Sequence, residues 1–245
     1  MGRALSVTNG VICLWLMAPV LYVLSQFSFN VAVLVECLPA LGTSLLLSAL
    51  ASLGALVLAF PVAFAMAVPS RAGTVMSLVS GLLLAVPDIV LGVALLMLYG
   101  KSGIFGMLFG DIFVNTWLGL LVAQLYCLTP YCIVLVAQVF RGTNRDILEA
   151  AYALGASRRT VAVQIYIRSN LRGLVRIFVT CTSFGLSMFG VIVVFAYWPK
   201  VMTTEIFERF HLFEFDNAMA LSTYLLLLSF VLYVTATVIE KQRTA

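Results

Sequence analysis

Long apolar stretches constrain this chain more than any other feature of its sequence. Six of them reach the length, about 20 residues, at which an α-helix crosses a lipid bilayer. They lie at about 11–29, 41–67, 75–99, 114–139, 172–196 and 218–239. Overall, 63% of the residues are hydrophobic and 10% are charged, whereas soluble domains are about 25% charged. The sequence therefore predicts an all-α integral membrane protein, with residues 1–245 forming a single transmembrane domain.

The basic residues predict how the six spans are oriented. If the N-terminus is cytoplasmic, the outer segments hold only Lys101, Lys200 and Arg209, and the other 11 of the 14 lysines and arginines face the cytoplasm. This bias follows the positive-inside rule, so we expect both termini in the cytoplasm. Arg3 before the first apolar run could instead mark a signal peptide, but no clear small-x-small cleavage site follows, and we interpret the run as a retained span.

Two further compositional features exclude other classes of protein. The net charge of +4 is modest and its basic residues cluster at one place, which argues against a general nucleic-acid binder. The five cysteines are scattered through apolar stretches without a C-x-x-C pair, so neither a disulfide framework nor a zinc site is predicted. Apolar packing is the expected role of these thiols.

The longest cytoplasmic segment, residues 141–171, joins the fourth and fifth spans. Residues 146–154 should be helical, because Ala and Leu are strong helix formers and the acids lie early in the segment, where the helix dipole favours them. Gly155 should end this helix in a left-handed conformation. Ser157 can then cap a second short helix that runs to Ile167. The segment therefore predicts a helix–turn–helix elbow at the membrane surface.

Ala150, Ala151 and Leu154 give this elbow a small apolar face that needs a partner. One interpretation is a helix that rests on lipid headgroups, with Arg158 and Arg159 facing the phosphates. The other is a helix that docks onto a cytoplasmic protein. The residues of the face do not decide between these two alternatives.

The spacing within the elbow resembles a known motif. Glu149-Ala150-Ala151, three residues, Gly155, nine residues and Ile165 resemble the EAA motif of permease subunits from binding-protein-dependent ABC importers of the type I fold. The resemblance extends from about residue 40 to residue 239, and its pattern is nearer to the spermidine/putrescine, thiamine, ferric-iron and phosphonate branches than to the sugar branch. The family pattern closes with Ile-x-Leu-Pro. Here Ile167 replaces the leucine and Arg168 stands where the proline is expected, which leaves the bend into the fifth span to be determined.

The resemblance implies both a function and partners. The elbow would be the coupling helix, which docks on a separate cytoplasmic ATPase dimer that binds ATP and Mg, while this chain holds no cofactor. A second permease chain, identical or related, would complete the translocation pathway, and an extracytoplasmic binding protein would deliver a small polar solute at the bacterial inner membrane. By the same match, the docking surface and its turn would comprise Glu149, Ala150, Ala151, Leu154, Gly155 and Arg158.

Several polar or aromatic side chains within the spans are candidates for the pathway or its gate. These residues are Asp88, Gln124, Thr129, Gln138, Ser183, Ser187, Met188 and Phe189. Asp88 follows Pro87 inside an apolar stretch, and an ionisable residue there usually faces an interior or a water path. Alternatively, Asp88 caps a helix that restarts after Pro87. For the fifth span, ordinary helix packing is the alternative to a pore lining.

No residue pattern in the chain supports catalysis or nucleotide hydrolysis. Gly100-Lys101-Ser102 resembles the end of a Walker A loop, but Leu95 occupies the position of its first glycine. Four acids and His211 in the outer loop at 205–216 could suggest a metal site, although a solvated acidic loop that helps to dock a binding protein is the favoured interpretation. We therefore predict a non-enzymatic permease. A secondary transporter without an ATPase and an intramembrane enzyme are the rival hypotheses.

Overall fold

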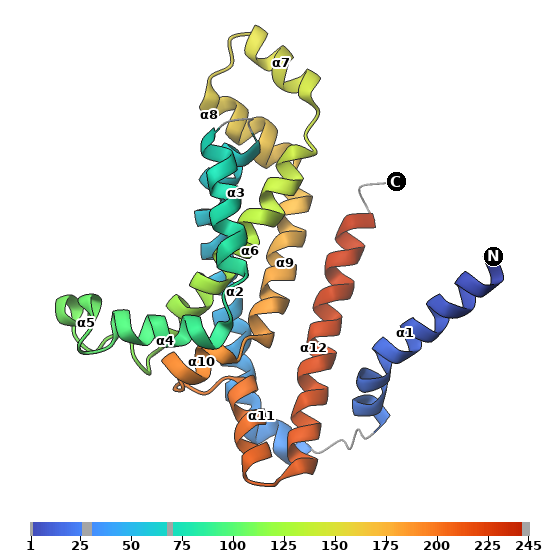
Figure 1. Cartoon of the computed structure of the whole chain (residues 1–245), viewed down its shortest axis with the longest axis vertical. Coiled ribbons are helices and arrows are strands. Elements are labelled where there is room, and N and C mark those ends of the chain that lie inside the picture. The colour runs from blue at the N-terminus through green and yellow to red at the C-terminus, as the bar shows by residue number, and fades with distance from the viewer. Residues whose placement is uncertain (1, 26–30, 68–70, 242–245) are drawn as a thin grey trace.

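The computed structural model describes residues 2–25, 31–67 and 71–241, and throughout this part of the chain its regular elements are helices (Figure 1). The helices are α1 (Gly2–Ser25), α2 (Val31–Ala67), α3 (Arg71–Leu84), α4 (Asp88–Tyr99), α5 (Ile104–Phe109), α6 (Trp117–Arg141), α7 (Arg145–Ala153), α8 (Arg158–Thr160), the π-helix η1 (Val161–Ile167), α9 (Leu171–Ser187), α10 (Gly190–Phe195), α11 (Met202–His211) and α12 (Phe215–Lys241).

Three of the described helices, α2, α6 and α12, are each long and apolar enough to cross a membrane. They correspond to the predicted spans at 41–67, 114–139 and 218–239. The helix α1 covers the predicted first span up to Ser25, and positions 26–29 of that span lie outside the described residues. In Figure 1, α1 stands apart from the other helices and lies beside α12, and its described side chains are mostly exposed.

Two predicted spans are not single straight helices. The expected helix at 75–99 is wrong in its continuity, because α3 and α4 meet at an angle of 101°. Pro87 has no backbone N–H and disfavours a helical conformation at Val86, so the helix stops and restarts at this point. The predicted span at 172–196 is likewise interrupted after Ser187, where Met188 adopts an extended backbone before α10 begins.

The helix α2 is longer than expected. Its 37 residues give a length of about 55 Å at 1.5 Å per residue, which exceeds the hydrocarbon thickness of about 30 Å. The predicted start at residue 41 misses the first ten residues, which extend the helix beyond the minimum needed for a span. Val33 and Cys37 in this extension pack against Met202 of α11 and Leu221 of α12.

A row of small residues on α2 forms the centre of the core. Ala51, Ala55, Ala59 and Ala63 recur every four residues, are fully buried, and belong to the same packed cluster as residues of α6 and α9. Small side chains let helices approach closely in lipid, so this row allows α2 to pack closely against α6 and α9. Between α6 and α9, the buried thiols of Cys132 and Cys181 lie 3.0 Å apart (Sγ to Sγ) as free cysteines.

Enlarging one alanine of this row should destabilise the bundle. We expect Ala55→Leu to reduce the free energy of unfolding in detergent by about 1–3 kcal/mol, because added methylenes force neighbouring side chains out of their rotamers. The matched control is Val57→Leu, since Val57 is 67% exposed on the same helix. Thermal unfolding of both variants checks the prediction, and equal midpoints would contradict it.

Candidate coupling elbow and translocation pathway

The turn at Gly155 has the predicted geometry. The helix α7 ends at Ala153, and Gly155 has φ +79°, a left-handed conformation that favours glycine. The Gly155 N–H donates to the Tyr152 carbonyl at 3.0 Å, and the Ala156 N–H donates to the Ala151 carbonyl at 3.0 Å. These two bonds form a Schellman motif, which satisfies carbonyls that the end of a helix leaves free.

The second helix of the elbow also begins where it was predicted. The Ser157 hydroxyl accepts a hydrogen bond from the Thr160 N–H at 3.2 Å, as an N-cap does. The helix continues through α8 into η1, which ends at Ile167. The elbow therefore consists of two short helices that meet at a glycine turn.

Asn170 forms the bend into the fifth span, which the replacement of the family's proline by Arg168 had left undetermined. Arg168 keeps helical backbone angles, so no bend occurs there, and the chain turns at Asn170 (φ −112°, ψ 15°) before α9 begins. The buried Asn170 amide donates to the Thr143 hydroxyl at 3.1 Å and to the Tyr166 carbonyl at 3.0 Å. It therefore joins the two ends of the elbow. The sequence motif does not include Asn170, and a polar residue close to several arginines is expected to be exposed, so its structural role was not predicted.

An aromatic cluster connects the elbow to two long helices. The Tyr166 ring packs edge-on against Phe140 of α6 and Phe64 of α2, with ring centroids 4.9 and 5.2 Å apart. Phe60 of α2 meets Phe140 in the same manner at 5.5 Å. Edge-to-face pairs of this kind add about 0.5–1.5 kcal/mol each beyond the burial of their surface. The second helix of the elbow is thus packed directly onto the ends of α2 and α6.

The first helix of the elbow has an inner and an outer face. Leu148 and Ala151 lie on the inner side and pack against the core cluster. Ile147, Ala150 and Leu154 form the outer side, where Leu154 is 88% exposed. Ala151, expected on the docking surface, is therefore only partly accessible. Glu149 and Gly155 are exposed, and the side chain of Arg158 lies outside the part that the structure describes.

Ser183 and Ser187 of α9 line a cavity of about 320 Å³ together with Tyr131 of α6 and Ser229 of α12. Because these serines border open space, they keep the role predicted for them as candidates for the pathway. Gly185 on the same helix has another function. A Cβ added there would lie 3.0 Å from the Ser48 side chain of α2, so this glycine permits the close approach of the two helices.

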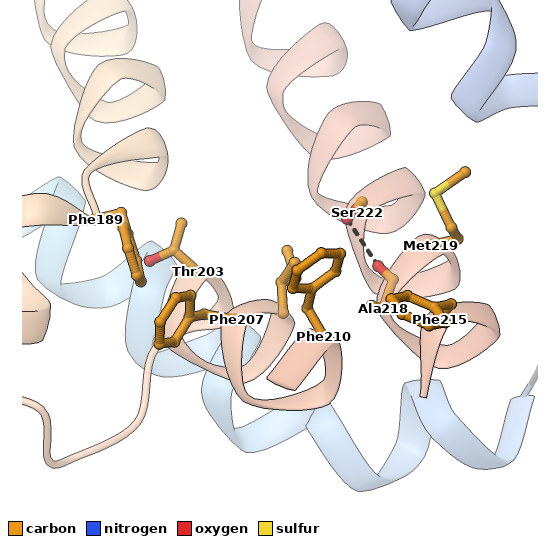
Figure 2. A pocket seen from close by; sticks show the side chains of 9 residues that line it. Phe189, Thr203, Phe207, Phe210, Phe215, Ala218, Met219 and Ser222 are labelled. Atoms are coloured by element: carbon orange, nitrogen blue, oxygen red, sulfur yellow. Dashed lines mark hydrogen bonds between the residues drawn. The ribbon is translucent and has the colours of Figure 1, made fainter. Parts of the chain in front are cut away.

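The predicted gate residues Met188 and Phe189 lie at the break between α9 and α10. The Met188 carbonyl, released from the helix by the break, accepts a hydrogen bond from the Thr203 hydroxyl of α11 at 3.0 Å. Phe189 lines an almost wholly apolar cavity of about 390 Å³ that also contains Phe207, Phe210 and Phe215 (Figure 2). The Phe189 and Phe207 ring centroids are 4.8 Å apart. The break thus directs an aromatic side chain towards α11 and α12.

Three other candidates differ in their surroundings. Asp88 is the exposed first residue of α4, directly after Pro87, so it lies in the first turn of a helix that restarts at this point. Gln124 is 1% exposed, and its amide donates to the Ser48 hydroxyl and the Gly185 carbonyl, both at 3.4 Å. Thr129 donates to the Leu125 carbonyl of its own helix. Gln124 thus connects helices inside the core.

Two cations organise the acidic segment at 205–216, which was predicted as an outer loop. Lys200 contacts Glu205 and Glu208. Arg209 contacts Glu214 at 2.7 Å and Glu36, at the start of α2, at 2.6 Å. Most of these acids are therefore ion-paired instead of freely solvated. Among the described residues, no group of three or more His, Cys, Asp or Glu is placed to hold a metal ion.

Comparison with known proteins now identifies the family. Residues 55–244 match the family of binding-protein-dependent transport system inner membrane components. The chain belongs to this family. It is a multi-pass membrane protein and a permease subunit of an ABC transport system, and such subunits are not the catalytic components.

Individual relatives agree with this assignment. The molybdate/tungstate transport system permease protein of Methanocaldococcus jannaschii is 26% identical over 233 residues, which cover 94% of this chain and 93% of that protein. The spermidine/putrescine transport system permease protein of Escherichia coli K12 is 31% identical over 172 residues, which cover 68% of this chain and 61% of that protein.

The fold itself has been seen in a solved structure. A bacterial alginate ABC transporter, crystallised in complex with an alginate pentasaccharide-bound periplasmic protein, contains a chain that matches with a TM-score of 0.74 at 14% identity. The match covers 99% of this chain and 94% of that one. The two chains therefore share a fold.

The spermidine/putrescine branch was among those expected from the sequence, whereas the molybdate/tungstate branch was not.

Removing the Asn170 amide should loosen the elbow. We expect Asn170→Leu to cost about 1–3 kcal/mol of local stability, because buried polar partners lose their hydrogen bonds. Hydrogen exchange should accelerate at residues 155–170 and remain unchanged in α12. Ser169→Ala, at an exposed neighbouring position, is the control. Unchanged exchange in Asn170→Leu would show that the amide does not hold the elbow.

The ion pairs of Arg209 should make the stability of the protein depend on pH. Hydrogen bonds from Arg209 and then Asn217 hold the pKa of Glu214 below its usual value of 4.5. Because the folded pKa is lowered, this contribution is present above pH 4.5 and is lost as the pH falls through the lowered pKa. Glu214→Gln should therefore melt below the wild type at pH 7 and together with it once the pH has fallen below the lowered pKa of Glu214. Glu149→Gln, at the opposite end of the molecule, should show no such convergence.

Proposed function

We propose that this chain forms half of the translocation pathway of an ABC importer, with six spans, both termini in the cytoplasm, and an elbow that docks on a cytoplasmic ATPase. The six spans are α1, α2, the bent pair α3–α4, α6, the broken pair α9–α10, and α12, within a single domain over residues 1–245. In Figure 1, the elbow lies at the top of the view, and the first residues of α1 and the last residues of α12 lie lower, at the upper ends of these two helices. We infer from the excess of basic residues that the upper side is the cytoplasmic one.

The exposed outer face of α7 is the observation that carries the proposal. Leu154 is 88% exposed at the end of a short helix whose other face is packed against the core. Ile147, which is 53% exposed, lies on the same outer face, and a patch of large apolar side chains favours a partner that covers it. Glu149 is exposed on the same helix, and its carboxylate would be repelled by lipid phosphates, which favours a protein partner.

The position of α7 further distinguishes a protein partner from a lipid surface. In Figure 1, α7 lies beyond the ends of α2, α3 and α6 and is the element farthest from the middle of the bundle at that end. A helix that rests on headgroups would lie level with the ends of the spans. We therefore place a cleft of the ATPase around Ile147, Ala150 and Leu154, with Glu149 and Gly155 at its edge.

Movement of the ATPase would reach the spans through the second helix of the elbow. The Tyr166 ring and the Asn170 amide join that helix to α2 and to the end of α6. A rigid connection of this kind lets the nucleotide state of a partner bias two arrangements of the bundle. ATP and Mg would be bound by the ATPase dimer, and the solute would come from an extracytoplasmic binding protein. A second permease chain would complete the pathway, and Ser183 and Ser187 would belong to its lining on this chain.

Two variants of the elbow test the docking surface. Glu149→Lys reverses a charge, and Gly155→Val places a β-branched residue at φ +79°, where left-handed backbone costs about 1–2 kcal/mol. Both proteins should insert normally, lose the co-purifying ATPase and reduce ATP-driven uptake by about tenfold or more. Asp111→Lys, a charge reversal between α5 and α6 and away from the elbow, should retain the ATPase.

The outcome also separates the rival functions. If the elbow variants transported solute at the wild-type rate with the ATPase still bound, the docking assignment would be wrong. If the purified chain alone, without any ATPase, accumulated solute in proteoliposomes along an ion gradient, it would be a secondary transporter.

A further inference from the structure

The turn between α11 and α12 exposes several large apolar side chains. Phe213 is 80% exposed at the tip of this turn, and its neighbours Leu212 and Phe215 are exposed as well. The Phe213 and Phe215 rings pack edge-on with their centroids 6.0 Å apart, and Phe215 packs in the same way on Phe210 at 5.4 Å. Adjoining apolar side chains on the surface of a folded protein mark a place where another molecule binds.

Phe213 also has a backbone conformation that favours glycine. Its φ is +62°, and the Phe213 N–H donates to the Phe210 carbonyl at 3.2 Å while the Glu214 N–H donates to the Arg209 carbonyl at 3.0 Å. These bonds form a Schellman motif, in which Phe213 takes the position that Gly155 takes in the elbow. A bulky residue is strained at this position, and strain of this kind is typical of residues that serve binding.

The base of the turn is fixed to the rest of the molecule. Arg209 donates hydrogen bonds to Glu36 of α2 at 2.6 Å and to Glu214 at 2.7 Å. The Asn217 amide donates to the same Glu214 carboxylate at 3.0 Å. The Phe213 ring is therefore held in place before a partner arrives, which lowers the entropy that binding costs.

The charge around the exposed rings is negative. The acids outnumber the bases here by five to two: Glu36, Glu205, Glu208, Glu214 and Asp216 against Lys200 and Arg209. Asp216 is exposed and takes part in none of the ion pairs found among the described residues. It lines a cavity of about 290 Å³ together with Phe213 and Phe215. A carboxylate beside aromatic rings complements a lysine or arginine side chain, whose stem is apolar and whose end is a cation.

The position of the turn favours a protein partner over the lipid bilayer. The turn lies at the bottom of Figure 1, and the elbow lies at the top. Glu36, beside the turn, and Phe64, beside the elbow, are separated by about 42 Å of helix at 1.5 Å per residue, which exceeds the hydrocarbon thickness of about 30 Å. At the level of the headgroups, the usual anchors are Trp and Tyr, whereas lipid phosphates would repel Asp216.

We propose that the turn around Phe213 is the docking contact for the extracytoplasmic binding protein. Phe213 enters an apolar depression on that protein, and Asp216 pairs with a lysine or arginine at its edge. The family to which the chain belongs is defined by its dependence on a binding protein. The inference rests on the proposed function, because the orientation given there places the turn outside the cytoplasm.

The apparent affinity for the binding protein tests the role of Phe213. The complete transporter is placed in nanodiscs and titrated with the purified binding protein that stimulates its ATPase activity. Phe213→Gly should raise the concentration for half-maximal stimulation about tenfold or more, because a single buried aromatic side chain often dominates an interface. Phe109→Ala, which removes an exposed ring from α5, should leave this concentration unchanged.

Hydrogen exchange separates binding from a merely structural role. Glycine adopts the left-handed conformation without strain, so amide exchange at residues 209–217 in Phe213→Gly should be no faster than in the wild type. Faster exchange with an unchanged half-maximal concentration would show that the ring only stabilises the turn, and this result would overturn the proposal.

A charge reversal tests the sign of the partner surface. Asp216→Lys should raise the half-maximal concentration severalfold at low ionic strength, and the difference from the wild type should shrink as salt is added. Asp111→Lys reverses a charge between α5 and α6 and should have no such effect. Equal titrations of Asp216→Lys and the wild type at low ionic strength would contradict the pairing with a basic side chain.

Photo-crosslinking distinguishes the binding protein from lipid. The residue p-benzoylphenylalanine is placed at position 213, and the transporter is irradiated with saturating binding protein. Mass spectrometry should detect an adduct with the binding protein. The same residue in place of Phe230, which is 61% exposed within the predicted sixth span, should give an adduct with phospholipid. A phospholipid adduct alone at position 213 would assign the turn to the bilayer surface and overturn the proposal.

The same titration separates this inference from the proposed function on which it rests. If no purified binding protein stimulates the ATPase activity of the wild-type transporter, the proposed function is wrong. If the wild type is stimulated and Phe213→Gly responds at the same concentrations, only the docking contact is wrong.

Discussion

The close approach of α2 to α6 and α9 is the contact on which the rest of the molecule depends. Four alanines spaced four residues apart on α2, and Ser48 about one turn before the first of them, are buried and have only small side chains. In lipid, packing of this kind holds helices together, because burial of apolar surface gains little there. The same helix continues past the core to meet α11 and α12 at one end and carries Phe60 and Phe64 to the elbow at the other. A single helix thereby connects the acidic segment at 205–216 to the elbow.

Two helix breaks lie beside this rigid centre, and they face each other. A Cβ added to Gly190, at the start of α10, would lie 3.0 Å from Asp88 at the start of α4. One added to Gly92 would lie 3.1 Å from Val191. The two short helices therefore pack against each other through glycines, after Pro87 has stopped one span and Met188 has stopped the other. Each break frees a backbone carbonyl, and at Met188 the Thr203 hydroxyl satisfies it. Non-helical backbone inside a membrane requires hydrogen-bond partners of this kind within the protein.

Local signals predicted much of this arrangement, and long-range contacts account for what they missed. Apolar length placed the spans, and Gly155 and Ser157 placed both helices of the elbow, because each of these residues determines the backbone around itself. The straight span across Pro87 was wrong because length alone ignores a 101° bend. Gln124 was expected beside the pathway, yet whether it faces a cavity or another helix depends on Ser48 and Gly185, which are distant in the sequence.

The replacement of the family's proline shows how one local device can substitute for another. A proline at position 168 would end the elbow by removing a backbone donor and fixing φ. Arg168 does neither, so the helix continues to it and the turn moves to Asn170. A proline imposes a bend whatever surrounds it, whereas the Asn170 amide holds the bend only while Thr143 and Tyr166 accept its hydrogen bonds. The angle between elbow and span is thus set by contacts that cross from one end of the elbow to the other. A displacement of the elbow by its partner would therefore be transmitted to α6 and α9 together.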